Sequence, residues 1–208
     1  MIQFTPVSQE NLLYLAENSE GIIMVQSWCA VTDAELMQIS SQNPDLRFER
    51  NADGTLVIMP PTGGISSNRE AKAVAYLLSW VESHALGEVF SSSGGFRLPN
   101  GAVRSPDAAF VAKGRLLENW DQGEDAFLNL APDFVIEVRS KTDSLETLQT
   151  KMREYIDNGV RLGWMITRQN QQAWVYRADQ SVTQYPATAI LSSEDVVPGF
   201  TLAVQSLL

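Results

Sequence analysis

The chain has 208 residues, a mass of 23.0 kDa, a formal net charge of −10 and a sequence pI near 4.5. With 44% hydrophobic and 19% charged residues, its composition is that of a folded globular protein and not of a disordered one. The acidic balance argues against a broad basic face that binds nucleic acid by releasing counterions, although a local basic cleft can coexist with an acidic exterior.

Several protein classes are disfavoured by what the sequence lacks. No apolar run approaches the ~20 residues that span a bilayer, and the start of the chain lacks a basic segment followed by an apolar one. Cys29 is the only cysteine, so no intrachain disulfide can form. His84 is the only histidine, which argues against Ser-His-Asp triads and multi-histidine zinc sites. We therefore expect a cytoplasmic protein without a membrane segment.

The first elements along the chain are a helix and a hairpin. Residues 32–35 (Thr-Asp-Ala-Glu) precede an apolar pattern and resemble a helix start. Residues 46–50 and 55–59 flank a turn that ends in Asp53-Gly54, which predicts a β-hairpin. We treat residues 1–44 as an N-terminal extension and residues 45–208 as the main domain, and we expect them to form one compact unit.

A long helix is predicted from Ser66 to about Ala85, where it is stopped by Gly87. Ser67 or Asn68 is the expected cap, and Glu70 is expected in the first turn, beside the positive end of the helix dipole.

Extended segments are predicted after this helix. Residues 88–91 and 95–98 suggest a strand bent or bulged around Gly94-Gly95, followed by a strand over residues 104–111. Residues 113–125 are polar and predict a loop.

The last predicted elements form a strand–helix–strand unit. Residues 134–138 are apolar apart from Glu137, as in a strand buried on both faces. A helix over residues 142–158 ends at Asn158-Gly159, and a buried strand covers residues 162–167. Two such strands form a parallel pair with a right-handed crossover. Residues 173–177 then complete a terminal hairpin, so the order of elements predicts an α/β fold.

Two acidic residues stand inside strand-like runs. Asp107 lies in residues 104–111 and Glu137 in residues 134–138. A carboxylate in an apolar strand is costly to bury unless it is paired or binds a cation. Two of them on neighbouring strands could hold one Mg²⁺ or Mn²⁺, which take oxygen ligands. The alternative is that both carboxylates cap loops or pair with Arg104, Arg139 or Lys141.

A lysine follows on the next predicted helix. Lys151 borders the apolar stripe formed by Leu148, Met152, Tyr155 and Ile156, so its ammonium could reach the carboxylates or a substrate phosphate. The alternative is that its stem follows the helix while the charged end stays in water.

These motifs, in this order, resemble a large bacterial family of restriction-endonuclease-like proteins in the PD-(D/E)XK superfamily. The matching segments are Ser105-Pro106-Asp107, Pro132–Ser140, Lys151–Tyr155, Asn158–Trp164 and Val175–Arg177. The resemblance covers roughly residues 45–180. It implies a mixed central sheet flanked by helices, with a hairpin and helix extension at the N-terminus.

The resemblance also implies roles for particular residues. Asp107 and Glu137 would be the metal ligands, the carbonyl of Val138 would add a third oxygen, and Glu70 matches an acidic residue that often completes such sites. The signature lysine is replaced by Arg139, a rigid fork that never deprotonates. In the family variant that this chain resembles, the lysine stands on the following helix, here at Lys151.

The leading hypothesis is a Mg²⁺- or Mn²⁺-dependent DNA endonuclease, with Arg139 contributing beside Lys151 because it shares the Glu137 side of the strand. The second is a degenerate member that binds nucleic acid or a protein partner without cutting, motivated by Arg139 and the charge of −10. The third is a structural homo-oligomer paired through exposed hairpins. A homodimer also suits an endonuclease, since cutting both strands of a duplex needs two sites.

Overall fold

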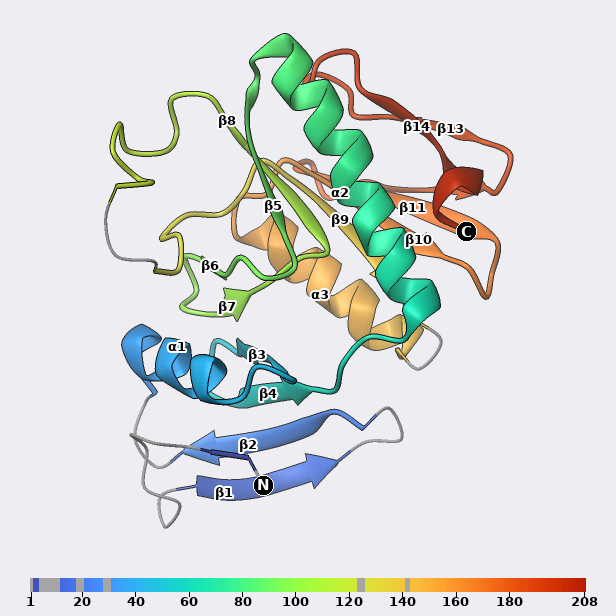
Figure 1. The fold of residues 1–208 in the computed structure, drawn as a ribbon. Coiled ribbons are helices and arrows are strands. Elements are labelled where there is room, and N and C mark those ends of the chain that lie inside the picture. Colours follow the sequence, from blue (N-terminus) through green and yellow to red (C-terminus); the bar gives the residue numbers. More distant parts are fainter. Residues whose placement is uncertain (1, 4–11, 18–20, 28–30, 123–125, 141–142) are drawn as a thin grey trace. The chain divides into compact units, whose positions relative to one another are not determined.

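The computed structural model describes residues 2–3, 12–17, 21–27, 31–122, 126–140 and 143–208. Cys29 and Lys141 lie outside the described residues. The chain divides into two compact units, whose helices and strands are labelled in Figure 1. The N-terminal unit comprises residues 1–62, 95–104 and 124–130, and the C-terminal unit comprises residues 63–94, 105–123 and 131–208. The boundary expected at residue 44 stays a prediction.

The N-terminal unit contains one sheet and one helix. The strand order is β1-β2-β4-β3-β7-β6, and every pairing between named strands is antiparallel. The elements are β1 (Leu12–Glu17), β2 (Ile23–Ser27), α1 (Asp33–Gln42), β3 (Arg47–Arg50), β4 (Leu56–Met59), β6 (Phe96–Arg97) and β7 (Val103–Arg104). The predicted hairpin over residues 46–59 is confirmed as β3 and β4, and the helix start at residue 32 is confirmed as the N-cap of α1.

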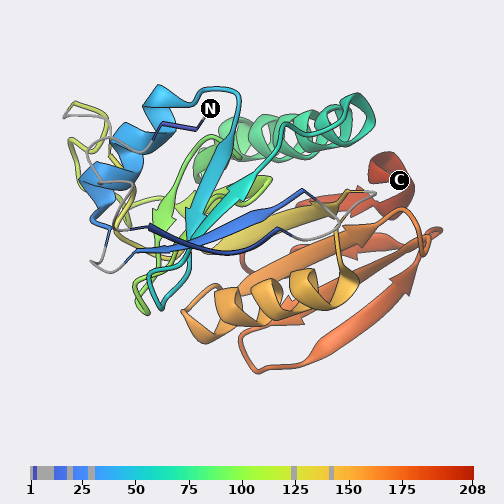
Figure 2. The ribbon, with the colours of Figure 1, turned by 90° about the horizontal axis from the view of Figure 1, so that it is seen from below.

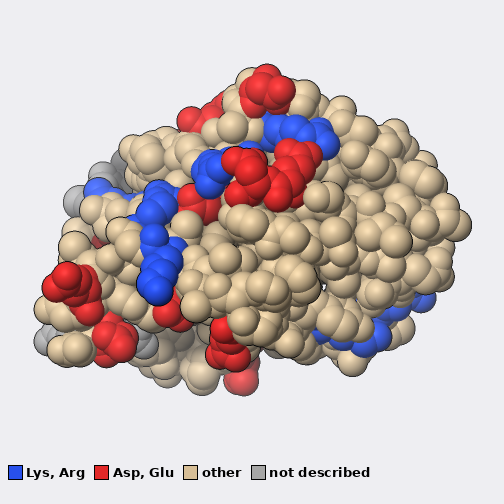
Figure 3. All heavy atoms as spheres, turned by 90° about the horizontal axis from the view of Figure 1, so that it is seen from above, with Lys and Arg blue, Asp and Glu red and all other residues tan. Residues whose placement is uncertain are grey.

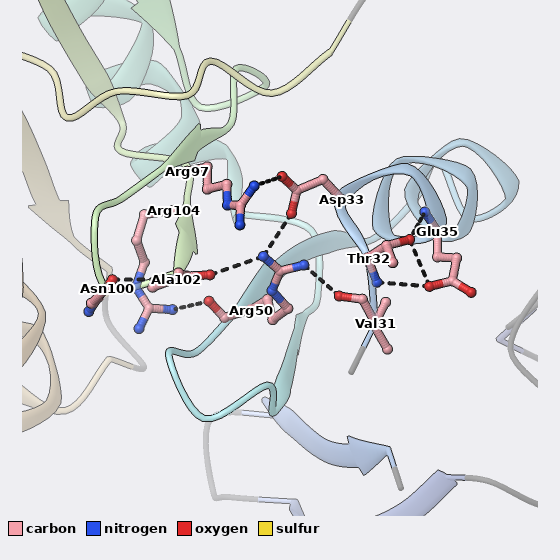
Figure 4. A network of polar contacts seen from close by, with 10 residues as sticks. Val31, Thr32, Asp33, Glu35, Arg50, Arg97, Asn100, Ala102 and Arg104 are labelled. Atoms are coloured by element: carbon pink, nitrogen blue, oxygen red, sulfur yellow. Dashed lines mark hydrogen bonds and ion pairs between the residues drawn. The ribbon is translucent and has the colours of Figure 1, made fainter. Parts of the chain in front are cut away.

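An arginine network joins three segments of the N-terminal unit (Figure 4). The Arg50 side chain is 9% exposed. It donates to the Val31 carbonyl at 2.5 Å, to Asp33 Oδ1 at 2.7 Å and to the Gly101 carbonyl at 3.0 Å. Arg97 approaches the other oxygen of Asp33 at 3.5 Å. A buried guanidinium is tolerated here because its donors meet acceptors.

The start of α1 is stabilised by a reciprocal cap. The hydroxyl of Thr32 accepts from the Glu35 amide, while Glu35 Oε2 accepts from the Thr32 amide at 2.8 Å. The backbone and side-chain donors of Thr32 hold the pKa of the exposed Glu35 carboxyl below its ordinary value of 4.5. The stabilisation from Glu35 is therefore present above pH 4.5 and is lost as the pH falls through the lowered pKa.

Replacing Thr32 by Ala is expected to lower the free energy of unfolding by about 1 kcal/mol at pH 7, since one capping acceptor is lost. At pH 3 the difference should shrink, because the partner carboxyl is then closer to neutral in both proteins. Urea denaturation of both proteins at the two pH values measures this. A difference that is larger at pH 3 would contradict the capping explanation.

The C-terminal unit is a mixed sheet between two helices. The strand order is β12-β11-β10-β9-β8-β5, with β9 and β10 parallel and the other pairs antiparallel. The elements are α2 (Gly64–His84), β5 (Gly87–Ser91), β8 (Ala108–Ala112), β9 (Phe134–Arg139), α3 (Leu145–Asp157), β10 (Leu162–Thr167), β11 (Gln172–Arg177) and β12 (Val182–Pro186). The predicted fold class and the parallel pairing of residues 134–138 with 162–167 are confirmed.

The two helices cover opposite faces of this sheet (Figures 1 and 2). Side chains alternate between faces along a strand. In β9, Ile136 shares one core cluster with Leu77 of α2. Val135 lies on the other face, next to Gly163 of β10. A Cβ added at Gly163 would lie 3.3 Å from the Val135 side chain and 2.5 Å from the side chain of Met152 in α3. Odd-numbered residues of β9 therefore face α3, and Glu137 is one of them.

The predicted strand over residues 104–111 is wrong as a single element. The chain forms β7 at Val103–Arg104 and β8 at Ala108–Ala112, which belong to different sheets. Pro106 separates them, because a proline has no amide hydrogen for a strand ladder. The bulged strand predicted around Gly94-Gly95 is also wrong. The Gly94 amide closes a turn by donating to the Ser91 carbonyl, and β5 and β6 pair in different sheets.

The predicted cap of the long helix is also wrong. Helix α2 begins two residues earlier than expected, after Gly63, and has no side-chain cap. Its first turn therefore holds no acidic residue, and Glu70 lies in the second turn. The helix ends at Ala85, which takes the left-handed conformation with φ 50°. Asn158 is confirmed as the end of α3, and Gly159 follows it with φ 99°.

The hairpin of β10 and β11 is confirmed, but it is not terminal. The chain continues into β12, β13 (Ile190–Ser192), β14 (Thr201–Ala203) and a short 3-10 helix, η2 (Val204–Leu207). This segment adds Phe200 to the core, where its ring stacks on Trp164 with centroids 5.7 Å apart. The mostly exposed residues of β12 give no apolar pattern that would have predicted it.

On the face drawn in Figure 3, basic side chains do not form one continuous surface, and some of those of the described residues stand close to acidic ones. This agrees with the acidic composition. Of the helices formed by described residues, none has the length and apolar character that crossing a bilayer requires.

Candidate metal centre

Asp107 stands immediately before β8 and is 6% exposed. Its Oδ2 accepts a hydrogen bond from the Val138 amide of β9 at 2.8 Å. The amide compensates in part for removing the carboxylate from water. The bond also fixes the Asp107 carboxylate beside the neighbouring strand, at the point where β8 begins.

Glu137 is 5% exposed and meets two groups of α3. Its Oε1 accepts from the Tyr155 hydroxyl at 2.9 Å and lies 3.0 Å from Lys151 Nζ. Lys151 also lies over the Tyr155 ring, 5.7 Å from its centroid. A charge-assisted hydrogen bond and an ion pair at one oxygen hold Glu137 in a single orientation.

The two carboxylates come from facing positions of adjacent strands. In the antiparallel ladder of β8 and β9, Ala108 faces Ile136 and Phe110 faces Phe134. Continuing this register by one residue places Asp107 opposite Glu137. Side chains of directly opposite residues lie on the same face with Cβ atoms roughly 5 Å apart. The fold therefore brings together the two acids that the sequence singled out.

Arg139 shares the face of Glu137 but turns toward nearby loops. Its Nε donates to the Asp143 carbonyl at 2.9 Å, and a terminal nitrogen donates to Asn170 Oδ1 at 3.2 Å. Lys151 contacts Glu137 instead, with a side chain only 19% exposed. These positions of Arg139 and Lys151 are those expected if the signature lysine stands on α3.

Glu70 and Val138 are placed differently. Glu70 is half-buried on α2, the helix that covers the opposite face of the sheet from Glu137. Among the described residues, no three carboxylate, imidazole or thiol groups come together as a metal-binding cluster. Val138 gives its amide to Asp107, which keeps its backbone at the site. The metal-ligand roles of both residues stay predictions.

The donor set fits a hard divalent cation. It consists of two buried carboxylates on adjacent strands, with a backbone segment between them in β9. Oxygen ligands of this kind suit Mg²⁺ or Mn²⁺, which are bound by one or two carboxylates together with water and phosphate oxygens. The set lacks the histidine and cysteine ligands of a structural zinc site.

Asp133 shows the contrasting case of a structural acid. It is 3% exposed, and its Oδ2 accepts from the Ala112 amide and lies 2.8 Å from a guanidinium nitrogen of Arg115. These contacts tie the entry of β9 to the end of β8. Asp133 therefore has a local structural role.

Tyr155 is the member of the site that sequence reasoning missed. It was assigned to the apolar stripe of the helix, and its side chain is indeed fully buried. Its hydroxyl nevertheless donates to Glu137. The available signal was its position four residues after Lys151, which places both on one helix face.

The C-terminal unit is a mixed sheet between two helices. It has an aspartate before one strand, a glutamate inside the next and a lysine on the following helix. These features define a protein with a restriction-endonuclease-like fold. The family with the description "Putative restriction endonuclease" (Uma2) matches residues 33–205, so the chain belongs to this family. The resemblance inferred from the motifs is thereby confirmed.

Among solved structures, the chain is similar to "a putative nuclease belonging to DUF820" from Anabaena variabilis. The two share 22% sequence identity with a TM-score of 0.67, over 77% of this chain and 88% of that one. At this identity the likeness shows the fold. No curated protein matches the chain. Family and fold together support a nuclease-like function.

Proposed function

We propose that this protein is a metal-dependent endonuclease that hydrolyses phosphodiester bonds of DNA. The observation that carries the proposal is the convergence of Asp107, Glu137 and Lys151. Two buried carboxylates alone have a structural explanation, as Asp133 demonstrates. A lysine drawn to the same oxygen that accepts from Tyr155 gives the site both the acids and the cation that phosphodiester hydrolysis needs.

Each residue of the proposed site has a distinct role. Asp107 and Glu137 would hold Mg²⁺ or Mn²⁺, with the Val138 carbonyl as a third oxygen. The bound ion would supply a Lewis acid that activates water and offsets charge on the phosphate. Lys151 would place a positive charge beside the attacked phosphate, and Tyr155 would keep Glu137 oriented. Arg139 would contact substrate and not the ion, because a guanidinium does not deprotonate.

The alternative function is that of a degenerate member, which binds nucleic acid or a protein without cutting. It is favoured by Arg139 in the signature position and by the charge of −10. The contact of Lys151 with Glu137 weighs against it, because the lysine ammonium that the strand lacks at position 139 is supplied by the helix.

The first experiment is a calorimetric titration of the purified protein with Mn²⁺ in a buffer free of phosphate and chelator. We expect binding in the wild type and at least a tenfold weaker affinity in Glu137→Ala, because a carboxylate ligand is lost. Asp133→Ala is the matched control, since it removes a buried acid that is engaged by Arg115. A wild type that binds no Mn²⁺ would contradict the metal site and favour the degenerate alternative.

Two further features complete the proposal. Cutting both strands of a duplex needs two centres, so we propose that the active form is a homodimer. Its place of action would be the cytoplasm, where DNA and free Mg²⁺ are both present. Light scattering with and without a DNA duplex tests the first point.

A further inference from the structure

A cavity of about 650 Å³ lies in the C-terminal unit at the same end of β9 as Arg139. It is lined by the start of α2, by Arg139 and by the turn between β10 and β11. Three of its lining residues are arginines: Arg69, Arg139 and Arg168. None of the lining residues is acidic. In a chain with a net charge of −10, such a local excess of positive charge needs an explanation.

The arginines of this cavity are held in place or available for a ligand. Arg139 is fixed by the Asp143 carbonyl and by Asn170, and Arg69 by the backbone oxygens of Ile65 and Leu208. The Nε of Arg69 is buried and has no hydrogen-bond partner among the described residues. Arg168 is exposed, and its guanidinium makes no hydrogen bond or ion pair with any described residue. The exposed guanidinium of Arg168 therefore offers the cavity donors that an anionic ligand can accept from.

The start of α2 adds donors to the same cavity. Gly63 caps the helix without a side-chain hydrogen bond, and residues 63–66 line the cavity. The first amides of a helix have no partner within it, and a helix of 21 residues carries partial positive charge at this end. The absence of acidic residues from the first turn leaves that charge uncompensated there. Helix amides and arginines together suit a phosphate group.

The cavity is linked to the candidate metal centre through β9. Arg139 and Glu137 are two residues apart and share one face of the strand, so they are separated by about 7 Å along it. A nucleic acid strand whose phosphate reaches Glu137 would therefore bring a neighbouring phosphate toward Arg139.

We propose that this arginine-lined cavity binds a backbone phosphate of a nucleic acid strand, next to the phosphate at the carboxylates. The phosphate at the carboxylates rests on the proposed function, whereas the phosphate in the cavity does not. Such a cavity also reconciles an acidic protein with a polyanionic substrate, because the positive charge is concentrated where the strand is held.

The test measures binding of a fluorescein-labelled, 20-nucleotide single strand of DNA without terminal phosphates, by fluorescence anisotropy. EDTA and the Glu137→Ala background remove cleavage and the metal, so the measurement does not depend on catalysis. Arg168→Gln is the variant, because its exposed side chain supports no other described residue. Arg161→Gln is the matched control: it removes the same charge from an arginine that pairs with Asp195.

We expect Arg168→Gln to weaken binding several-fold and to reduce the slope of log affinity against log salt by about 0.7, the value for one lost contact to a single strand. Arg161→Gln should leave the slope unchanged. Equal changes in both variants, or no binding by the Glu137→Ala protein at 50 mM salt, would overturn the inference. If Arg168→Gln leaves DNA binding unchanged while the wild type binds Mn²⁺ in the calorimetric titration, the cavity is refuted and the metal centre stands. If Arg168→Gln weakens DNA binding while the wild type binds no Mn²⁺, the metal centre alone is refuted.

Discussion

Replacing Asp107 by Asn is expected to lower metal-dependent cleavage of DNA by about 10²- to 10³-fold, the range seen when one preorganised electrostatic group is removed from an active site. Asparagine has the shape of aspartate, and its oxygen can still accept from the Val138 amide at the position of Oδ2. The neutral amide removes the negative charge that would hold Mg²⁺. The fold should therefore persist while the metal affinity falls.

The measurement is a single-turnover assay on a DNA duplex with Mg²⁺ or Mn²⁺, at protein concentrations above that of the substrate. Asp133→Asn is the matched control, because Asp133 is also buried, also accepts from a backbone amide and stands near the same pair of strands. It is expected to lower stability through its contact with Arg115 while leaving the cleavage rate of the folded protein unchanged. Wild-type rates in Asp107→Asn would rule out the proposed role of this carboxylate.

The acids of the candidate site could be predicted from the sequence because they violate its local pattern. Glu137 interrupts an apolar run and Asp107 stands directly before another, and a charge in such a place needs a partner. The fold class followed from the same strands. Residues 134–138, apart from Glu137, and residues 162–167 are apolar runs typical of strands buried on both faces, and the segment between them has the hydrophobic periodicity of a helix. These signals are strong because burial is encoded residue by residue.

The surroundings of the acids could not be predicted in the same way. The hydroxyl of Tyr155 serves Glu137 while its ring belongs to the core, and a hydrophobic pattern registers only the ring. Arg69, Arg139 and Arg168 come from a helix, a strand and a turn that are distant in sequence. No local spacing relates them, so their common cavity appears only once the chain is folded.

The break at Ser105-Pro106-Asp107 is an intermediate case. The proline was visible, and a proline inside a strand pattern favours an interruption. Reading the segment as one strand gave the right side chain for the site but the wrong ladder, because β7 and β8 pair in different sheets. Because the break falls at Pro106, Asp107 stands at the start of the β8 ladder, where its carboxylate accepts from the Val138 amide.

Gly87 presents the largest stability effect that we expect from a single methyl group. A Cβ added there would lie 2.1 Å from the Val111 carbonyl oxygen and 2.9 Å from the Lys113 amide nitrogen, and the residue has φ 154°. Both neighbours are backbone atoms, so no side chain can move aside. Gly87→Ala is expected to lower the free energy of unfolding by about 3 kcal/mol or more, since the strand itself must shift.

Gly114→Ala separates this clash from the ordinary cost of a positive φ. Gly114 has φ 84° with no atom within 4 Å of an added Cβ, so its replacement should cost only about 1 kcal/mol. Urea denaturation of both variants compares them, and equal losses would show that crowding at β5 is not the cause. The pairing at stake is the ladder in which Gly87 faces Ala112 of β8. Because β8 begins directly after Asp107, a protein that tolerates Gly87→Ala by shifting this ladder should also lose affinity for Mn²⁺, whereas Gly114→Ala should retain it.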